Sequence, residues 1–255
     1  GLTIKISSAV PGFAVVTGLF VLYWIYAYVR PDLRLAALGA GSAVLIAYTH
    51  VGAALSYAMT AIDWPLLDPQ FAALDRHIGF NWIGYLSWTA AHPSIARGLR
   101  AAYFSSMYQT AAVIVALALL GQIQRLIAFL WLFILTSATV IVLSGLLPAA
   151  GAFVYHEPAA ALRAVVGLDA GVWHLDQFEA LRRGSLTVID FSKLEGLVTF
   201  PSFHTALAMI CAWGFWTVRY ARWPMAALGA VIISSTTSIG GHYLIDVIGG
   251  GALTV

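Results

Sequence analysis

Long apolar runs separated by short polar connections dominate the chain. We expect seven helices that cross a membrane, at about residues 10–29, 35–59, 100–120, 126–147, 201–218, 224–239 and 242–255. Runs of about 20 apolar residues have the length that an α-helix needs to cross a bilayer, whereas the strands of a membrane β-barrel show a weaker alternation. The pattern therefore predicts an all-α integral membrane protein, a polytopic helical bundle of about seven spans.

Two polar segments interrupt this pattern. In residues 61–96 three aromatic side chains are spaced three apart and share one helical face: Trp82, Tyr85 and Trp88. Such a face is typical of a helix that lies in the membrane interface. A solvated face is a simpler interpretation of the aspartates in this segment than a head-group or divalent-ion site: Asp63, Asp68 and Asp75. The second segment, residues 148–199, is a long polar connection between two spans.

The composition supports a membrane protein, because 61% of the residues are hydrophobic, 9% are charged and the mean hydropathy is +0.87. A soluble domain has roughly 45–50% apolar and about 25% charged residues. The 255 residues leave no room for a large soluble domain, and the net charge of +2 gives no indication of nucleic acid binding. The single Cys211 excludes an internal disulfide and a cysteine metal cluster.

The two ends of the chain affect the number of spans. The first apolar run lacks the small-residue cleavage site of a signal peptide, so we interpret it as a span. The last run has fourteen residues up to Val255, which gives roughly 21 Å of helix against about 30 Å of hydrocarbon. We therefore expect the natural chain to continue beyond Val255.

The loop charges predict the orientation of the bundle. The connections after the first, third and fifth spans carry arginines: Arg30, Arg34, Arg125, Arg219 and Arg222. Cationic short loops stay in the cytoplasm, so residues 61–96, residues 148–199 and the Gly240-Gly241 turn are expected on the extracytoplasmic face. Counting the spans then places His204 and His242 together at that face.

His242 and Asp246 lie four residues apart, so they share one face of a helix. A carboxylate inside a membrane is costly unless it has a partner, and it marks a functional site by default. Asp246 is placed to accept the Nδ1–H of His242, which leaves Nε2 free as a base or nucleophile. The same spacing also suits a structural hydrogen bond that ties two helices together.

The second polar cluster, Pro201-Ser202-Phe203-His204-Thr205, lies at the start of the fifth span. Proline is favoured as the first helical residue, and the amides of Phe203, His204 and Thr205 at this helix end suit an anion such as phosphate. Ser202 is placed to cap the helix or to donate to the anion, and His204 to give a proton to a leaving oxygen. A capped helix start with an interfacial histidine is the alternative interpretation.

Together, these two clusters fit phosphoryl transfer through a covalent phosphohistidine at one membrane face. In this scheme His242 attacks phosphorus and Asp246 orients it. His204 protonates the departing alcohol and then deprotonates the incoming acceptor. The scheme requires no metal and no other cofactor.

Several further residues are candidates for binding the substrate. Tyr103 and Gln109 belong to a polar stripe with Ser106 that suits a cavity wall, although hydrogen bonding between helices explains this stripe slightly better. Gly240 and Gly241 form the turn before His242, and Lys193 is a candidate to fold over the site, with a solvated role as the simpler interpretation. The remaining external histidines are expected at the surface or interface, without a zinc-site spacing: His77, His92, His156 and His174.

Pro201-Ser202-Phe203-His204 resembles the second signature of the type 2 phosphatidic acid phosphatase superfamily, which is usually Pro-Ser-Gly-His. His242-x-x-x-Asp246 resembles the end of its third signature, Ser-Arg-x5-His-x3-Asp. The resemblance covers about residues 100–255. It implies a six-helix catalytic membrane domain over residues 35–255, preceded by an N-terminal span and a short cytoplasmic loop over residues 1–34. It also implies the roles given above for the two histidines and the aspartate.

The chain departs from these signatures at the cations that hold phosphate. The arginine of the third signature falls at Thr236, and the first signature, Lys-x6-Arg-Pro, falls at Val140 for its lysine and at Leu147-Pro148 for Arg-Pro. In this respect the chain is similar to the branch of fungal inositol phosphorylceramide synthase and its bacterial relatives, which implies transfer of a phosphorylated head group between lipids. The loss of three cations suits a diester, with a charge of about −1, better than a monoester with about −1.5 to −2.

We therefore expect an enzyme that cleaves a phosphoester of a membrane lipid and passes the phosphoryl unit to water or to a second lipid alcohol. The non-enzymatic alternative is a transporter or channel whose histidine and aspartate side chains relay protons. The chain shows neither an internal repeat nor a broken helix in the middle of a span, and its polar residues cluster at one face. These features favour the enzyme.

Overall fold

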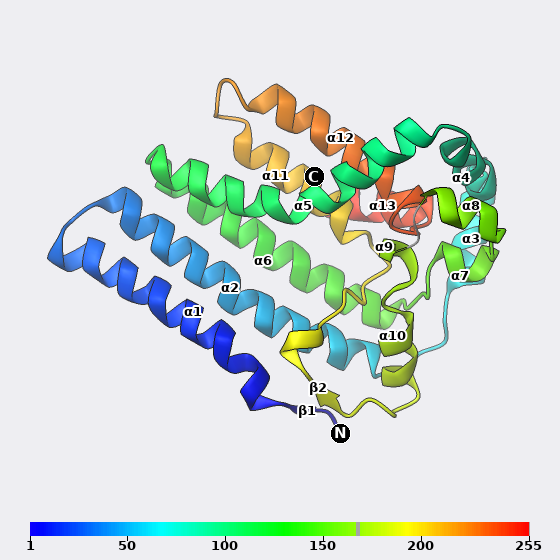
Figure 1. Cartoon of the computed structure of the whole chain (residues 1–255), viewed down its shortest axis with the longest axis horizontal. Helices are drawn as coiled ribbons and strands as arrows, with labels where there is room; N and C mark the ends of the chain where they lie inside the picture. Colours follow the sequence, from blue (N-terminus) through cyan, green and yellow to red (C-terminus); the bar gives the residue numbers. More distant parts are fainter. Residues whose placement is uncertain (167–168, 255) are drawn as a thin grey trace.

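Four long helices form the body of the molecule (Figure 1). The computed structural model describes residues 1–166 and 169–254. Within these residues, four helices are long and apolar enough to cross a membrane: α1 (Ile6–Trp24) with its π-helical continuation η1 (Ile25–Val29), α2 (Leu33–Thr60), α5 (Pro93–Leu119) and α6 (Ile123–Leu146). They cover the first four predicted spans, and the prediction of an all-α membrane protein is confirmed.

Three shorter helices complete the bundle: α11 (Phe203–Phe215), α12 (Arg222–Ser238) and α13 (Leu244–Ala252). The thirteen residues of α11 extend for about 20 Å, less than the predicted span over residues 201–218. Its first turn begins only after Ser202, which is the N-cap. Tyr243 is likewise the N-cap of α13, so this helix also begins two residues later than predicted.

Short helices gather at one end of the bundle, beside the start of α13 (Figure 1). Residues 61–96 form α3 (Asp68–His77), α4 (Trp82–Ala91) and the first turn of α5, which begins seven residues earlier than predicted. The long connection forms α7 (Ala152–His156), α8 (Ala160–Val166), α9 (Asp169–Val172), α10 (Leu175–Arg182) and the 3-10 turn η2 (Phe191–Lys193).

A two-stranded parallel sheet ties the N-terminus to this connection. Strand β1 (Thr3–Ile4) pairs with β2 (Val188–Ile189), with Thr3 opposite Val188. Next to the sheet, Nζ of Lys5 lies 2.8 Å from Oδ2 of Asp190. The first helix therefore holds the part of the long connection that follows β2.

Close contacts between helices hold the membrane body together. Buried side chains of α5, α6 and α11 form its central core, including Val113, Ile114, Leu117, Leu126, Phe129, Phe133, Leu207 and Ile210. Helix α1 packs on α2 at Gly39, where a Cβ atom would lie 3.0 Å from backbone atoms of Leu19 and Tyr23. Small residues of this kind let two membrane helices approach closely. Close packing stabilises their contact, because lipid tails are as apolar as the side chains and the hydrophobic effect does not drive the helices together.

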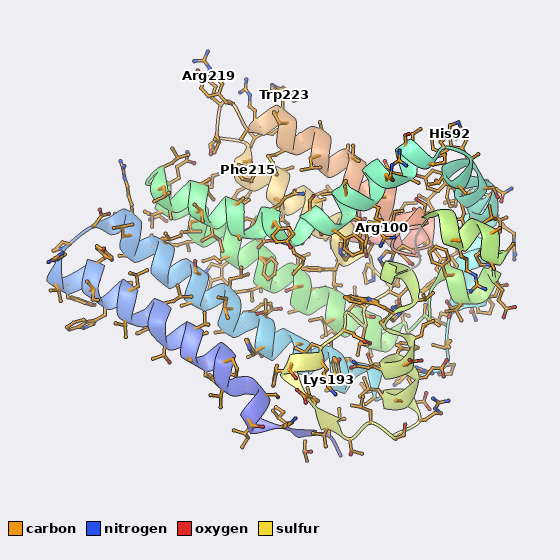
Figure 2. All side chains as sticks on the ribbon, in the orientation of Figure 1. His92, Arg100, Lys193, Phe215, Arg219 and Trp223 are labelled. Atoms are coloured by element: carbon orange, nitrogen blue, oxygen red, sulfur yellow. The ribbon has the colours of Figure 1, made fainter. Side chains whose placement is uncertain are left out.

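The two ends of the bundle differ in structure. Arg219 and Trp223 lie where α11 connects to α12, whereas His92 lies at the other end of the molecule, beside α4 (Figure 2). The short helices α3, α4 and α7 to α10 lie towards the His92 end, so the two polar segments of the chain meet there.

Candidate active site

The turn between α12 and α13 brings His242 and Asp246 together. Nδ1 of His242 lies 3.2 Å from Oδ2 of Asp246, and both side chains are buried. The same carboxylate oxygen accepts the backbone N–H of Tyr243 at 3.0 Å, so it fixes the imidazole and the start of α13 together. A carboxylate at Nδ1 favours the tautomer in which Nε2 carries the lone pair. The ring also makes a hydrogen bond with the backbone of Thr199. The structure therefore forms the predicted pair, but His242 precedes Tyr243, the N-cap of α13, so the prediction that both residues share one face of a helix is wrong.

The first turn of α11 carries the other histidine, His204. Oγ of Ser202 accepts the backbone N–H of Thr205 at 3.4 Å, so the prediction of a capped helix start is confirmed. The prediction of Pro201 as the first helical residue is wrong, because Pro201 precedes the cap. The cap also uses the amide of Thr205, which is therefore not free to bind an anion as the sequence suggests.

Tyr103 of α5 holds the ring of His204. Its hydroxyl lies 3.3 Å from Nδ1 of His204, and the two rings stack with centroids 4.2 Å apart at 19°. Gly240 leaves room for this arrangement, because a Cβ atom there would lie 2.8 Å from the Tyr103 ring. Stacking and hydrogen bonding together fix one side of the imidazole and leave Nε2 for a substrate.

Asp75 of α3 supports the turn from outside. Its two carboxylate oxygens accept the backbone N–H groups of Leu244 and Ile245, each at 2.9 Å, and so cap α13. Burial raises the pKa of Asp75, and the two amide hydrogen bonds oppose this rise. The prediction of a solvated face is therefore wrong for Asp75, whose side chain caps the first turn of α13.

Asp68 is also buried rather than solvated. Its Oδ1 accepts the hydroxyl hydrogen of Tyr243 at 2.9 Å, and its carboxylate accepts the backbone N–H groups of Ala150 and Gly151 at 2.9 Å. Asp68 thus joins the residue next to His242 to the start of the long connection. Of the three aspartates, Asp63 has the most exposed side chain, 56%, and it pairs with an arginine of α10.

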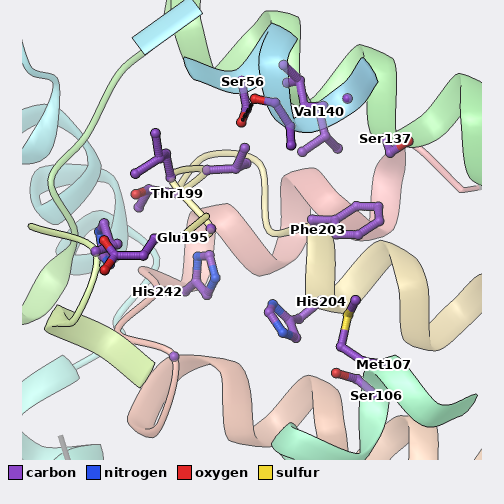
Figure 3. A pocket seen from close by; sticks show the side chains of 18 of the residues that line it. Ser56, Ser106, Met107, Ser137, Val140, Glu195, Thr199, Phe203, His204 and His242 are labelled. Atoms are coloured by element: carbon purple, nitrogen blue, oxygen red, sulfur yellow. Dashed lines mark hydrogen bonds between the residues drawn. The ribbon is translucent and has the colours of Figure 1, made fainter. Parts of the chain in front are cut away.

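A cavity of about 470 Å³ lies beside both histidines (Figure 3). His204 and His242 both line it, and Figure 3 shows their imidazoles next to each other. Apolar side chains form most of the remaining wall, including Ala53, Phe104, Met107, Phe133, Val140, Ile141, Leu197, Val198 and Phe203. The volume is typical of a small-molecule site, and the wall suits an apolar substrate.

His174 and Glu195 are among the polar residues of this cavity that the sequence analysis missed. His174 is buried rather than at the surface, and burial lowers its pKa to about 4. Burial also raises the pKa of the Glu195 carboxyl. Both residues belong to the long connection, whose path over the cavity depends on contacts that no local sequence pattern reveals.

The predicted binding residues fall into two groups. Four line the cavity: Tyr103, Phe203, Gly240 and Gly241. The other four do not line it: Ser202, Thr205, Gln109 and Lys193. The first three of these are buried in the bundle, with Gln109 donating to Oγ of Ser105 at 3.1 Å. Lys193 is exposed in η2, where its backbone carbonyl accepts a hydrogen bond from Gln177. A role in binding stays a prediction for all eight.

Cations are missing from the cavity wall in the part of the chain that the structure describes. Val140, at the expected lysine position, lines the wall, and Thr236 is fully buried. The arginines of α10 are used elsewhere, because Arg182 pairs with Asp63 at 2.8 Å and Arg183 pairs with Glu179 at 3.3 Å. Among the described residues, no group of three histidine, cysteine, aspartate or glutamate side chains is arranged to hold a metal ion.

Comparison with known proteins places this arrangement in a family. No curated protein and no solved structure matches the chain. Residues 69–255, which contain both histidines, Asp246 and the long connection, match the PAP2 superfamily, and membership suggests a phosphatase-type enzyme. Since the match spans most of the 255 residues, the chain belongs to the PAP2 superfamily.

Proposed function

We propose that the chain is a membrane lipid phosphatase or phosphotransferase that works through a phosphohistidine at His242. One observation carries the proposal: His242, oriented by Asp246 at 3.2 Å, lines the same apolar cavity as His204. A nucleophile, its orienting carboxylate and a second acid/base group are the set that two-step transfer needs.

In the first step, the Nε2 lone pair of His242 forms a bond to phosphorus. The bond from phosphorus to the leaving alcohol oxygen breaks, and His204 gives that oxygen a proton. Asp246 stabilises the positive charge that develops on the imidazole of His242. The anionic phosphoester next to His204 favours the protonated imidazole that this step requires.

In the second step, His204 takes a proton from the acceptor hydroxyl. The acceptor oxygen forms a bond to phosphorus, and the bond between phosphorus and Nε2 of His242 breaks. Water as the acceptor gives a phosphatase, and a lipid alcohol gives a phosphotransferase. The hydrogen bond and the ring stack from Tyr103 keep His204 in place through both steps.

The cavity wall supports a lipid as the substrate. The wall extends from His242 along α2 and α6 as far as Tyr48 and Phe133. On α5 it includes Phe104 and Met107, whose side chains are 42% and 60% exposed on the outside of the bundle. An apolar tail therefore finds continuous apolar surface between the bilayer and the histidines. The arginine-rich connections at the opposite end of the bundle support an active site on the extracytoplasmic face.

The charge of the cavity supports a phosphodiester over a phosphomonoester. A monoester carries about −1.5 to −2 at neutral pH, and the described wall offers it a carboxylate and no cation. A diester carries one negative charge and needs less compensation. The missing cations and Phe203 in the usual glycine position of the signature support head-group transfer of the inositolphosphotransferase-like kind.

Purified His242→Ala, compared with the wild type, tests this function. We expect turnover of a phosphodiester lipid to fall at least about a thousandfold, because the nucleophile is absent. His92→Ala, at an exposed histidine outside the cavity, is the matched control and should keep full activity. Unchanged turnover of the lipid by His242→Ala would refute the mechanism. Efficient cleavage of a phosphomonoester without any reaction of a diester would refute the diester preference alone.

A further inference from the structure

The cavity contains two acceptor atoms that the proposed mechanism does not use. Oε2 of Glu195 and Nε2 of His174 are buried, and neither has a hydrogen-bond partner among the described residues. Both residues line the cavity that contains His242. Buried polar atoms without partners are rare in folded proteins and call for an explanation, such as a bound ligand.

The protein holds Glu195 firmly in this position. The backbone N–H of Glu195 donates to the hydroxyl oxygen of Tyr57 at 3.0 Å. Tyr57 in turn donates to Oε1 of Gln177, and Nε2 of Gln177 donates to the backbone oxygen of Lys193 at 2.7 Å. Helices α2 and α10 thus fix the segment that carries the carboxylate. Because two helices fix this segment, ligand binding costs little further conformational entropy there.

His174 presents a lone pair rather than a proton. One side of its ring makes a hydrogen bond with the backbone of Ala150, and burial keeps the ring neutral by lowering its pKa to about 4. A neutral imidazole that donates to a backbone oxygen has an acceptor at its other nitrogen. Gln177 makes a hydrogen bond with the Glu195 side chain, but Oε2 of Glu195 and Nε2 of His174 still lack donors. The described cavity wall has no lysine or arginine to provide them.

The positions of the side chains indicate which part of a substrate provides these donors. In Figure 3, Glu195 and His204 lie on opposite sides of His242. In the proposed reaction His204 protonates the leaving oxygen, so the leaving lipid alcohol lies on the His204 side. The group that remains on phosphorus is then directed towards Glu195.

We propose that Glu195 and His174 form a subsite for the head group of a phosphodiester lipid, one that presents O–H or N–H donors. This inference rests on the proposed function and adds the class of head group that the site selects. Hydroxyl groups and a primary ammonium group both satisfy the two acceptors. A fully methylated ammonium group and a simple alkyl ester satisfy neither.

Two lipid pairs of equal charge test the subsite. Phosphatidylethanolamine and phosphatidylcholine differ in N–H donors, and phosphatidylglycerol and phosphatidylmethanol differ in hydroxyl donors. Binding of each lipid is measured by competition in detergent with the full-length His242→Ala variant, which holds the lipid without turnover. We expect about tenfold tighter binding of the donor-bearing member of at least one pair, as one hydrogen bond to a charged group provides. A preference within the first pair indicates a site for an ammonium group, and a preference within the second pair indicates a site for hydroxyl groups.

When Glu195→Gln is added to the His242→Ala variant, the preference for the donor-bearing lipid should fall to less than about threefold, because the charged acceptor is lost. His174→Gln should reduce it to a smaller degree. Glu179→Gln, at an exposed residue of α10, is the matched control and should keep the full preference. Equal binding within both pairs, or a preference that survives Glu195→Gln, would overturn the subsite. Because binding is measured without turnover, a failure of the proposed chemistry leaves this test intact.

Discussion

Asp75→Ala removes the carboxylate that caps α13. This change tests whether the cap supports turnover as well as stability. The side chain accepts two backbone N–H groups at 2.9 Å and is only 2% exposed. Each buried amide left without a partner costs about 1–3 kcal/mol, so the free energy of unfolding should fall by about 2–6 kcal/mol. Asp246 lies in the same helical turn and orients His242, and a shift of about 1 Å in such a group costs about a hundredfold in rate.

The assay measures thermal unfolding in detergent and lipid turnover per folded molecule. We expect Asp75→Ala to lower both, and Asp75→Asn, which keeps one acceptor oxygen, to lie between it and the wild type. Asp32→Ala is the matched control, because Asp32 caps α2 through two backbone N–H groups far from the site. It should cost about 1 kcal/mol and leave turnover unchanged. If Asp75→Ala loses stability but keeps full turnover per folded molecule, the reasoning about the turn is refuted.

Three further changes probe the site. Tyr103→Phe keeps the ring stack but removes the hydroxyl 3.3 Å from Nδ1 of His204, and kcat/KM should fall about tenfold in a lipid turnover assay. Gly240→Ala puts a Cβ atom 2.7 Å from a backbone oxygen and 2.8 Å from the Tyr103 ring, so both the melting temperature and turnover should fall. The pKa of His174 is about 4 in the folded protein against about 6.5 unfolded, so protons favour unfolding as the pH falls from 6.5 to 4. His174 should contribute up to about 3 kcal/mol to the loss of unfolding free energy across that range. His174→Gln, unlike His77→Gln at an exposed site, should reduce that loss in a pH series of melting curves.

Much of the fold follows from the sequence because a bilayer allows few structures. A run of about 20 apolar residues has to satisfy its backbone internally, so it predicts a helix almost independently of its neighbours. The same reasoning overestimates α11 and α13, because Pro201, His242 and Tyr243 lie within the predicted spans but outside the helices. Apolar residues show which part of the chain lies in the membrane, whereas capping residues determine where a helix begins.

The site is predictable only where its parts are close in sequence. His242 and Asp246 are only four residues apart, so the turn before α13 and the first turn of this helix bring them together. Asp75 meets Leu244 across 169 residues, and its charge in a polar segment suggests solvent instead of a buried cap. His174 and Glu195 lie on a connection whose path depends on contacts with α2 and α10, so their place in the cavity is a property of the folded chain.

The most direct test of the account is the covalent state of His242 during turnover. A reaction with a phosphodiester lipid is stopped within milliseconds under alkaline conditions, and the peptide that contains His242 is analysed by mass spectrometry. We predict a phosphorus-containing adduct on the His242 imidazole of the wild type and none in His242→Ala. An adduct on another residue, or steady turnover by His242→Ala, would contradict the proposal that this histidine is the nucleophile.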